Sequence, residues 1–215
     1  FKMRNIRGKR PKPGLMRQHL TCVNAAAEVC GADVDGAEIG STELSFKPGR
    51  IKGGEYQFAI GSGGSTTLVL QTVLPALMYA PTSSEVRIEG GTHNPLAPPF
   101  EFVEQCYLPI LRGMGCDVVV ELLKHGFMKS GGGVLMAHIK PLAKWKSIRM
   151  LERGELLETF GVVIHAHLDR SIVNREITSA AGILEWAPEK IEVRYANDSQ
   201  GSGNAILLGA RLSLI

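Results

Sequence analysis

The clearest chemical feature of this 215-residue chain is a basic segment near its start. Residues 7–20 read R-G-K-R-P-K-P-G-L-M-R-Q-H-L and lead into a run of apolar residues with helical spacing. Five cations fall within eleven positions: Arg7, Lys9, Arg10, Lys12 and Arg17. A basic loop that feeds a helix N-terminus can bind an anion, because unpaired backbone N–H groups and the helix dipole favour negative charge there. A solvated basic loop would have the same composition, so both interpretations stay open on these residues alone.

Polar residues next to this segment and in a glycine-rich run are candidates for ligand contacts. Residues 61–67, G-S-G-G-S-T-T, predict a tight strand-to-helix turn with an exposed helix N-terminus, although no lysine follows the glycines as in a P-loop. Gln71, one turn into the helix that follows, is either an exposed helix residue or a ligand contact. Gln18 and His19 fall in the first turn of the earlier helix, where His19 is either a hydrogen-bonded, partly buried histidine or a site residue.

The sequence offers little for a metal or a nucleophile. His165 and His167 alternate in a predicted strand and would share one face, which is an arrangement that can bind a metal. No carboxylate or cysteine at close spacing completes such a site, so the pattern does not favour one. H-E-x-x-H, a Ser-His-Asp order and paired carboxylates are also absent from the sequence. These residues predict an α/β repeat protein with a basic, anion-binding loop, and no more.

The elements that must position these residues follow from apolar periodicity. Helices are predicted over residues 14–30, 68–80, 100–114 and 171–184. Strands are predicted over residues 1–6, 42–47, 55–60, 85–89, 117–122, 134–139, 160–168, 191–195 and 205–212. The order strand, Pro-rich loop, helix, glycine, strand, glycine-rich turn, strand occurs in residues 1–60 and again in 85–140. We therefore expect a repeat of about 84 residues, each unit an α/β sandwich with helices on one face of a small sheet.

The composition and one charged segment indicate the domain organisation. Hydrophobic content of 44%, charged content of 21% and a net charge of +3 are typical of a globular protein and exclude a generic polycation. The segment L-E-R-G-E at residues 151–155 predicts a boundary, with residues 1–148 forming a large domain and residues 149–215 an incomplete smaller one. The chain starts at Phe1 without a methionine and stops at Ile215 without a terminal cap, so we expect a piece of a longer protein.

The cysteines and the hydropathy pattern point to an intracellular protein. Four cysteines form no C-x-x-C pair, and we predict reduced thiols: Cys22, Cys30, Cys106 and Cys116. No run of 18 apolar residues and no signal peptide occur in the sequence, so neither a membrane span nor a membrane partner is predicted. We expect a cytoplasmic location.

Taken together, the motifs resemble those of the RNA 3′-terminal phosphate cyclases. The basic segment is similar to the family signature I-R-A-G-R-x-x-P-G-L-x-x-Q-H-L. Further blocks that match are G-A-E-I-G-S-T-E-L-S-F-K-P-G (36–49), I-G-S-G-G-S-T-T-L-V-L-Q-T-V-L-P (60–75), E-G-G-T-H-N-P-L-A-P-P (89–99), H-G-F-M-K-S-G-G-G (125–133) and L-E-R-G (151–154). They occur in the family order and spacing, so the resemblance covers nearly the whole chain.

The resemblance implies a fold and an activity. Members of the family are built from repeated α/β units like the C-terminal domain of translation initiation factor three, with a smaller α/β domain inserted after the second unit. They use ATP, with Mg²⁺ or Mn²⁺, to convert an RNA 3′-phosphate to a 2′,3′-cyclic phosphate through an adenylylated histidine and an RNA-adenylate. The charge transferred is negative phosphoryl charge, so arginines and helix N-termini are the expected stabilisers.

The resemblance also assigns residues by motif. Phosphates of ATP or RNA would be contacted by Arg7, Arg10, Lys12 and Arg17. The ATP site would be formed by Gln18, His19 and Gln71, with Pro98 and Pro99 flanking the adenosine.

Two parts of the family pattern are missing. The opening D-G-x-x-x-E-G-G-G-Q-x-x-R, with a metal-binding Glu and an Arg, would precede Phe1, and the nucleophilic histidine is expected beyond Ile215. None of the six histidines occupies that motif. The resemblance therefore predicts no catalytic residue and no metal ligand within residues 1–215, and no self-adenylylation by this chain.

Two alternatives to a cyclase are kept. A non-catalytic relative of the family acts in ribosome assembly, but it lacks the Q-H-L that is present here as Gln18-His19-Leu20. The other alternative is a single-stranded RNA-binding module, which would bind RNA with strong salt dependence and without preference for a 3′-phosphate end.

Overall fold

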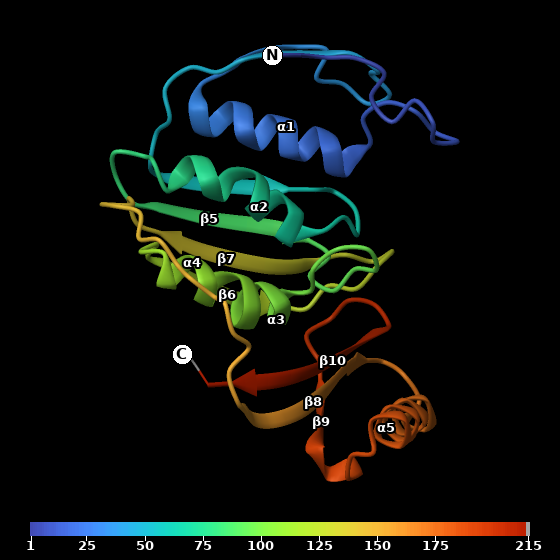
Figure 1. Cartoon of the computed structure of the whole chain (residues 1–215). Helices are drawn as coiled ribbons and strands as arrows, with labels where there is room; N and C mark the ends of the chain where they lie inside the picture. Colours follow the sequence, from blue (N-terminus) through green and yellow to red (C-terminus); the bar gives the residue numbers. More distant parts are fainter. Residues whose placement is uncertain (214–215) are drawn as a thin grey trace.

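The structure is a computed structural model that describes residues 1–213. In it, the start of the chain forms a small sheet over a helix. Strands β1 (Lys2–Met3), β2 (Asp33–Asp35) and β3 (Leu44–Lys47) are antiparallel in the order β1-β3-β2. Helix α1 (Arg17–Cys30) lies beneath this sheet (Figure 1). It ends where Gly31 adopts a left-handed φ of 56°, a conformation that glycine takes without steric cost.

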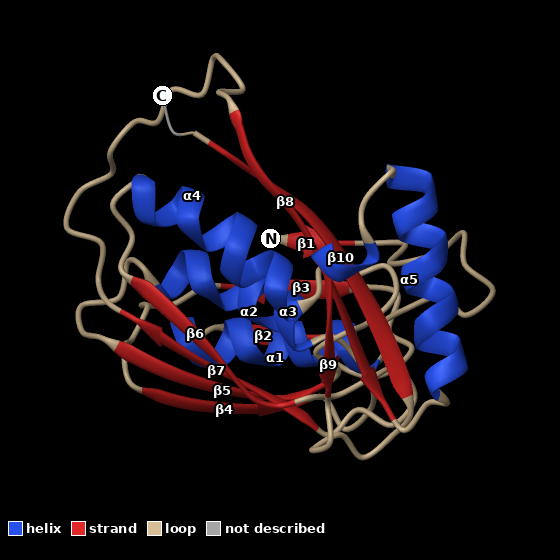
Figure 2. Ribbon diagram, turned by 90° about the horizontal axis from the view of Figure 1, so that it is seen from below, coloured by secondary structure: helices blue, strands red, loops and turns tan. Residues whose placement is uncertain are grey.

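The middle of the chain forms a larger sheet with helices on one face. Strands β4 (Glu55–Ala59), β5 (Ser84–Gly90), β6 (Val118–Lys124) and β7 (Gly133–Ile139) are ordered β4-β5-β7-β6, with only β4 and β5 parallel. Helix α2 (Thr66–Leu77) connects β4 to β5. A second helical segment connects β5 to β6 and consists of α3 (Phe100–Phe102), the π-helix η1 (Val103–Tyr107) and α4 (Leu108–Gly113). Both lie on the same side of the sheet and bury its apolar face (Figure 2).

The strand order confirms the α/β class and the internal repeat. In β1-α1-β2-β3 the first strand pairs with the third and the third with the second, and β5, β6 and β7 repeat this arrangement. One assignment was wrong: residues 55–60 do not close the first unit but start the second as β4. The strand that was missed, β2, reads D-V-D and has only one apolar residue, so it shows too little alternation to be recognised.

The last part of the chain is a separate small sheet with one helix. Strands β8 (Leu156–Ala166), β9 (Ile191–Tyr195) and β10 (Gly203–Leu212) are ordered β10-β8-β9, and α5 (Arg170–Leu184) packs on one face, followed by the 3₁₀ turn η2 (Pro188–Lys190). A linker without helix or strand, residues 140–155, leads to β8, and the predicted boundary at residue 148 lies within it. No helix within residues 1–213 is long and apolar enough to cross a membrane.

The small sheet is docked on the larger one through the loop between β6 and β7. Phe127 of this loop is 2% exposed and forms a core cluster with residues on β8 and in the loop after β9: Val162, Ile164, Ala166 and Ala196. His125 of the same loop donates its backbone N–H to Asp198 Oδ2 at 2.9 Å, and its Nδ1 lies 2.8 Å from Asp198 Oδ1. These hydrogen bonds lower the pKa of Asp198, although its partial burial alone would raise it.

Candidate anion-binding site

The N-terminus of α1 is open to an anion. The helix begins at Arg17, and the preceding Met16 provides no side-chain hydrogen bond to cap it. Its first turn contains no acidic residue, and both Met16 and Arg17 are exposed. The backbone N–H groups of the first turn and the helix dipole therefore favour a negatively charged group at this end.

His19 adds a neutral hydrogen-bond donor to this helix end. Its Nδ1 accepts the backbone N–H of Met16 at 3.2 Å, which leaves the proton of a neutral ring on Nε2. Partial burial lowers the pKa of His19 below its ordinary value, and the nearby positive charge of Arg7 lowers it further. The ring is therefore neutral at pH 7, and its Nε2–H can be donated to a ligand.

The basic loop before α1 is held in shape by one of its own arginines. Arg7 Nη1 donates to the carbonyls of Lys12 at 2.6 Å and Gly14 at 2.9 Å, and the side chain is half-buried. Arg10 and Lys12 are exposed and form no ion pair with any residue in 1–213. Arg7 thus folds the loop, while Arg10 and Lys12 are free to attract an anion.

The first turn of α1 is fastened to the glycine-rich turn between β4 and α2. Arg17 Nη1 donates to the carbonyl of Gly61 at 2.7 Å. One position along, Gln18 Nε2 donates to the carbonyl of Ser65 at 3.2 Å. Two segments more than 40 residues apart in the sequence therefore form one surface, with the cationic turn of α1 beside the glycines.

The expectation of an exposed helix N-terminus at residues 61–67 was wrong. Ser65, Thr66 and Thr67 are all buried. Ser65 Oγ caps α2 by accepting the N–H of Leu68 at 3.3 Å, and the N–H of Thr66 donates to the carbonyl of Gly91 at 2.8 Å. The Ser65 hydroxyl and the Gly91 carbonyl thus satisfy two N–H groups at the start of α2 from within the protein. The open helix N-terminus is that of α1.

The proline loop is brought to the same place by a buried hydroxyl. Thr67 Oγ1 donates to the carbonyl of Pro98 at 2.7 Å, and Asn94 donates its amide N–H to the carbonyl of Gly63. Pro98 and Pro99 are half-buried beside the start of α2. The structure therefore brings Gln18, the glycine-rich turn and the prolines close together.

Gln71 lies farther along α2. It is half-buried and falls on the outward stripe of the helix with Thr72 and Pro75, while Leu70 and Leu74 are fully buried. Its amide makes no side-chain hydrogen bond within residues 1–213, so it is free to contact a ligand.

Two buried amide oxygens in this region have no partner. Gln18 Oε1 and Asn94 Oδ1 are both enclosed without a hydrogen bond among residues 1–213. They lie against glycines: a Cβ on Gly64 would be 2.7 Å from Gln18 Oε1, and one on Gly91 would be 2.2 Å from Asn94 Oδ1. An unpaired buried acceptor costs about 1–3 kcal/mol. The exposed cations and the open helix end fit a phosphorylated ligand, whereas these enclosed oxygens are out of its reach.

The residues described here do not fit a divalent cation. Within residues 1–213 no group of three or more His, Cys, Asp or Glu side chains could hold a metal ion. The pair of histidines considered for a metal is separated: His165 is buried in β8, whereas His167 lies past the strand end with a left-handed φ of 51° and its Nε2 is 2.9 Å from the carbonyl of Ser199. We therefore derive no step that uses a metal.

A further group of polar residues near the site was not found from the sequence. His93 is buried, with Nδ1 2.8 Å from Thr92 Oγ1 and Nε2 2.9 Å from Glu101 Oε2. Burial of Glu101 opposes ionisation, but the hydrogen bond from His93 prevails and lowers the pKa of Glu101. The His93 ring stacks on that of His125, with centroids 5.6 Å apart. The T-H-N-P motif was the only sign in the sequence that His93 has a special environment, and it did not indicate Glu101 as the partner of His93.

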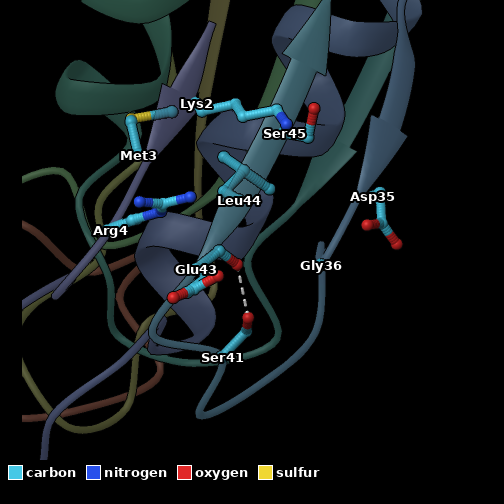
Figure 3. A pocket seen from close by; sticks show the side chains of 9 residues that line it. All are labelled: Lys2, Met3, Arg4, Asp35, Gly36, Ser41, Glu43, Leu44 and Ser45. Carbon is cyan, nitrogen blue, oxygen red and sulfur yellow. Dashed lines mark hydrogen bonds between the residues drawn. The ribbon is translucent and has the colours of Figure 1, made fainter.

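A separate pocket lies outside this site. It has a volume of about 310 Å³ and is bordered by Lys2, Arg4, Asp35 and Glu43 at the small sheet of the first unit (Figure 3). The one hydrogen bond drawn there runs from Ser41 Oγ to the carbonyl of Glu43 at 2.6 Å. Its two acids and two cations give it no preference for an anion, in contrast to the end of α1.

Comparison with known proteins gives the family of this chain. The sequence profile of the family described as RNA 3′-terminal phosphate cyclase matches residues 1–205. Curated proteins named RNA 3′-terminal phosphate cyclase are 48% identical in Koribacter versatilis, 46% in Ectopseudomonas mendocina and 49% in Pseudomonas fluorescens, each over 208 residues or 97% of this chain. The chain spans 59%, 61% and 60% of the lengths of these relatives. The match over most of the chain shows the family: the chain belongs to the RNA 3′-terminal phosphate cyclases.

Proposed function

We propose that this chain provides the ATP- and phosphate-binding part of an enzyme that converts an RNA 3′-phosphate to a 2′,3′-cyclic phosphate. The observation that carries the proposal is the open N-terminus of α1, fastened by Arg17 and Gln18 to the glycine-rich turn. The α1 end, Arg10, Lys12 and Arg17 would hold phosphate charge. Gln18, Gln71 and the Pro98–Pro99 loop would contact the nucleoside, and the neutral His19 would donate a hydrogen bond from Nε2.

These residues would act by electrostatic stabilisation of negative charge. Transfer of the adenylyl group and cyclisation both move negative charge between phosphate oxygens, and fixed donors aimed at those oxygens stabilise it without reorganisation. ATP would act as the substrate that activates the RNA end. The reading as a ribosome-assembly relative without activity has no observation in its favour, since the Gln18-His19 pair lies within the site.

The six histidines support a further part of the proposal, namely that this chain binds ATP without becoming adenylylated. His93, His125 and His167 are hydrogen-bonded to protein groups, and His165 is buried. His138 lies between two glutamates on the outer face of the larger sheet. His19 remains, and its neutral ring is placed to donate.

A binding experiment tests the proposal. We expect the chain to bind ATP reversibly, to prefer an oligonucleotide with a 3′-phosphate over one with a 3′-hydroxyl, and to acquire no covalent label from α-³²P-ATP. Arg17→Met removes a cation and the tether to Gly61, so it should weaken ATP binding by about tenfold or more. Arg50→Met, an exposed cation outside the site, is the matched control. Failure to bind ATP, or equal affinity for the two RNA ends, would refute the proposal.

A further inference from the structure

The linker between the two sheets is the second basic segment of the chain. Residues 140–153, K-P-L-A-K-W-K-S-I-R-M-L-E-R, contain five cations and one acid. The loop at residues 7–17 contains five cations and no acid, so the rest of the chain has 14 cations against 20 acids. Positive charge is thus concentrated in two segments of a chain that is otherwise acidic.

The linker cations are free. Lys140 pairs with Asp117 at 2.7 Å, but Lys144, Lys146, Arg149 and Arg153 form no ion pair or side-chain hydrogen bond within residues 1–213. All four are exposed. A cation that serves the fold usually has a carboxylate or carbonyl partner, and these have none among the described residues.

An aromatic pair stands among these cations. Trp145, between Lys144 and Lys146, is 38% exposed and donates its indole N–H to the hydroxyl of Tyr79, which is 60% exposed at the end of α2. The ring centroids are 6.5 Å apart. Leaving large aromatic surface in water gives no stability to the fold, whereas a nucleobase can stack on such a ring.

The linker is held in a fixed position, which reduces the entropic cost of binding. The N–H of Leu142 donates to the carbonyl of Met78 at 2.8 Å, and that of Lys146 donates to the carbonyl of Met114 at 2.9 Å. These bonds fasten the linker to the ends of α2 and α4, beside which it runs down to β8 (Figure 1). Lys144, Trp145 and Lys146, which lie between or at these two bonds, are therefore presented in a fixed position.

This surface is separate from the site at the start of α1. Strand β7 begins at Gly133, next to the glycine-rich loops, and ends at Ile139, where the linker starts. The seven residues of β7 separate the start of the linker from the glycine-rich loops by about 20 Å. Figure 1 shows the linker at the opposite end of the sheet from those loops.

We infer that the linker, with Lys144, Trp145, Lys146, Arg149 and Tyr79, binds single-stranded RNA by stacking of bases and neutralisation of phosphates. It would hold the body of an RNA strand whose end lies elsewhere, without reading its sequence. Cations interleaved with aromatic rings are the usual composition of such surfaces. An anionic membrane would also attract lysines beside a tryptophan, but the Trp145 N–H is already bonded within the protein and the segment is not an amphipathic helix.

The test uses the whole chain and a labelled oligouridine of about 20 nucleotides with a 3′-hydroxyl, without ATP. The salt dependence of its affinity is measured between about 50 and 200 mM salt. The triple variant Lys144→Gln/Lys146→Gln/Arg149→Gln should reduce the slope of log K against log salt by about 2, since each single-strand phosphate contact contributes about 0.7. The matched control Lys47→Gln/Arg50→Gln/Lys52→Gln removes the same charge from another exposed stretch.

The aromatic pair is tested separately. Trp145→Leu should weaken binding by about tenfold, Trp145→Phe by less, and Tyr79→Leu should also weaken it. Absence of binding by the wild type, equal loss in the two triple variants, or unchanged affinity in the Trp145 and Tyr79 variants would overturn the inference. So would tighter, Trp145-dependent binding to phosphatidylserine vesicles than to RNA. Because the probe lacks a 3′-phosphate and ATP is omitted, a failure of the α1 site would not affect this result.

Discussion

Replacing Thr67 with valine tests how the site is assembled. Thr67 is fully buried, and its hydroxyl lies 2.7 Å from both the Pro98 carbonyl and Ser65 Oγ. Valine has the same shape but no hydroxyl, so the carbonyl of Pro98 loses its donor while the packing is kept. A lost hydrogen bond that leaves one partner enclosed costs about 2 kcal/mol. For a chain of this size that lowers the melting temperature by about 4–8 °C.

The same variant should affect ligand binding. The Thr67 hydroxyl bonds the Pro98–Pro99 end of the loop to the start of α2, while Asn94 fastens the other end to Gly63, so loss of the hydroxyl loosens the prolines, which must be ordered again when a nucleotide binds. That ordering costs about 1 kcal/mol, or about a fivefold loss in ATP affinity. Thermal melting followed by circular dichroism and calorimetric titration with ATP measure the two effects on one sample.

Two matched variants make the result interpretable. Thr67→Ser keeps the hydroxyl and should retain ATP affinity. Thr72→Val removes an exposed hydroxyl on the same helix that bonds only to the carbonyl of Leu68, so its stability should change by less than about 0.5 kcal/mol. If Thr67→Val melts like the wild type, the hydroxyl does not support the fold. If it melts earlier yet binds ATP normally, the proline loop is not part of the ATP site.

Two further outcomes follow from the docking loop and from the histidine at the start of α1. Phe127→Ala should destabilise the contact between the two sheets by about 3–5 kcal/mol and so speed trypsin cleavage of the linker. Phe102→Ala, which removes a ring that is 43% exposed, should not change the cleavage rate. Equal cleavage rates in the two variants would contradict this. The pKa of His19 is lower in the folded than in the unfolded state, so the folded state binds fewer protons as the pH falls. The free energy of unfolding therefore keeps its full value above pH 6.5 and decreases as the pH falls through 6.5 towards the folded pKa of His19. Urea unfolding from pH 7.5 to 5.5 should therefore show a steeper loss in the wild type than in His19→Gln, and parallel curves would refute the assignment.

The fold could be predicted wherever apolar residues repeat over several turns or strand positions. The helix expected at residues 171–184 and the strand at 191–195 match α5 and β9 closely, because α5 buries Val173 and Ala181 and the sequence of β9, I-E-V-R-Y, alternates apolar or aromatic with charged residues. The first strand, expected over residues 1–6, was reduced to two residues. Asn5 and Arg7 take left-handed φ values of 55° and 52°, which end the strand, and the spacing of apolar residues does not predict such values.

The site could be predicted as a set of residues but not as an arrangement. The charge of the basic loop and the motif around Gln18 pointed to the segment where the structure has the open end of α1. The sequence did not tell which helix end is open, since serine and threonine are expected both at a cap and at a ligand contact. Ser65 caps α2 locally, but the bonds of Thr66 to Gly91 and of Thr67 to Pro98, which enclose its start, do not follow from the sequence. Such pairings join segments about 25 to 31 residues apart, which is beyond any local pattern.

The architecture explains why the site needs more than one unit. The first unit contributes α1 and the basic loop, and the second contributes the glycine-rich turn and the proline loop. A Cβ on Gly131 would lie 2.8 Å from the carbonyl of Ser62, so the docking loop packs directly against that turn. The same loop is held from its other side by Asp198 and by the cluster around Phe127. The small sheet therefore packs on the same loop that lies against Ser62 in the glycine-rich turn.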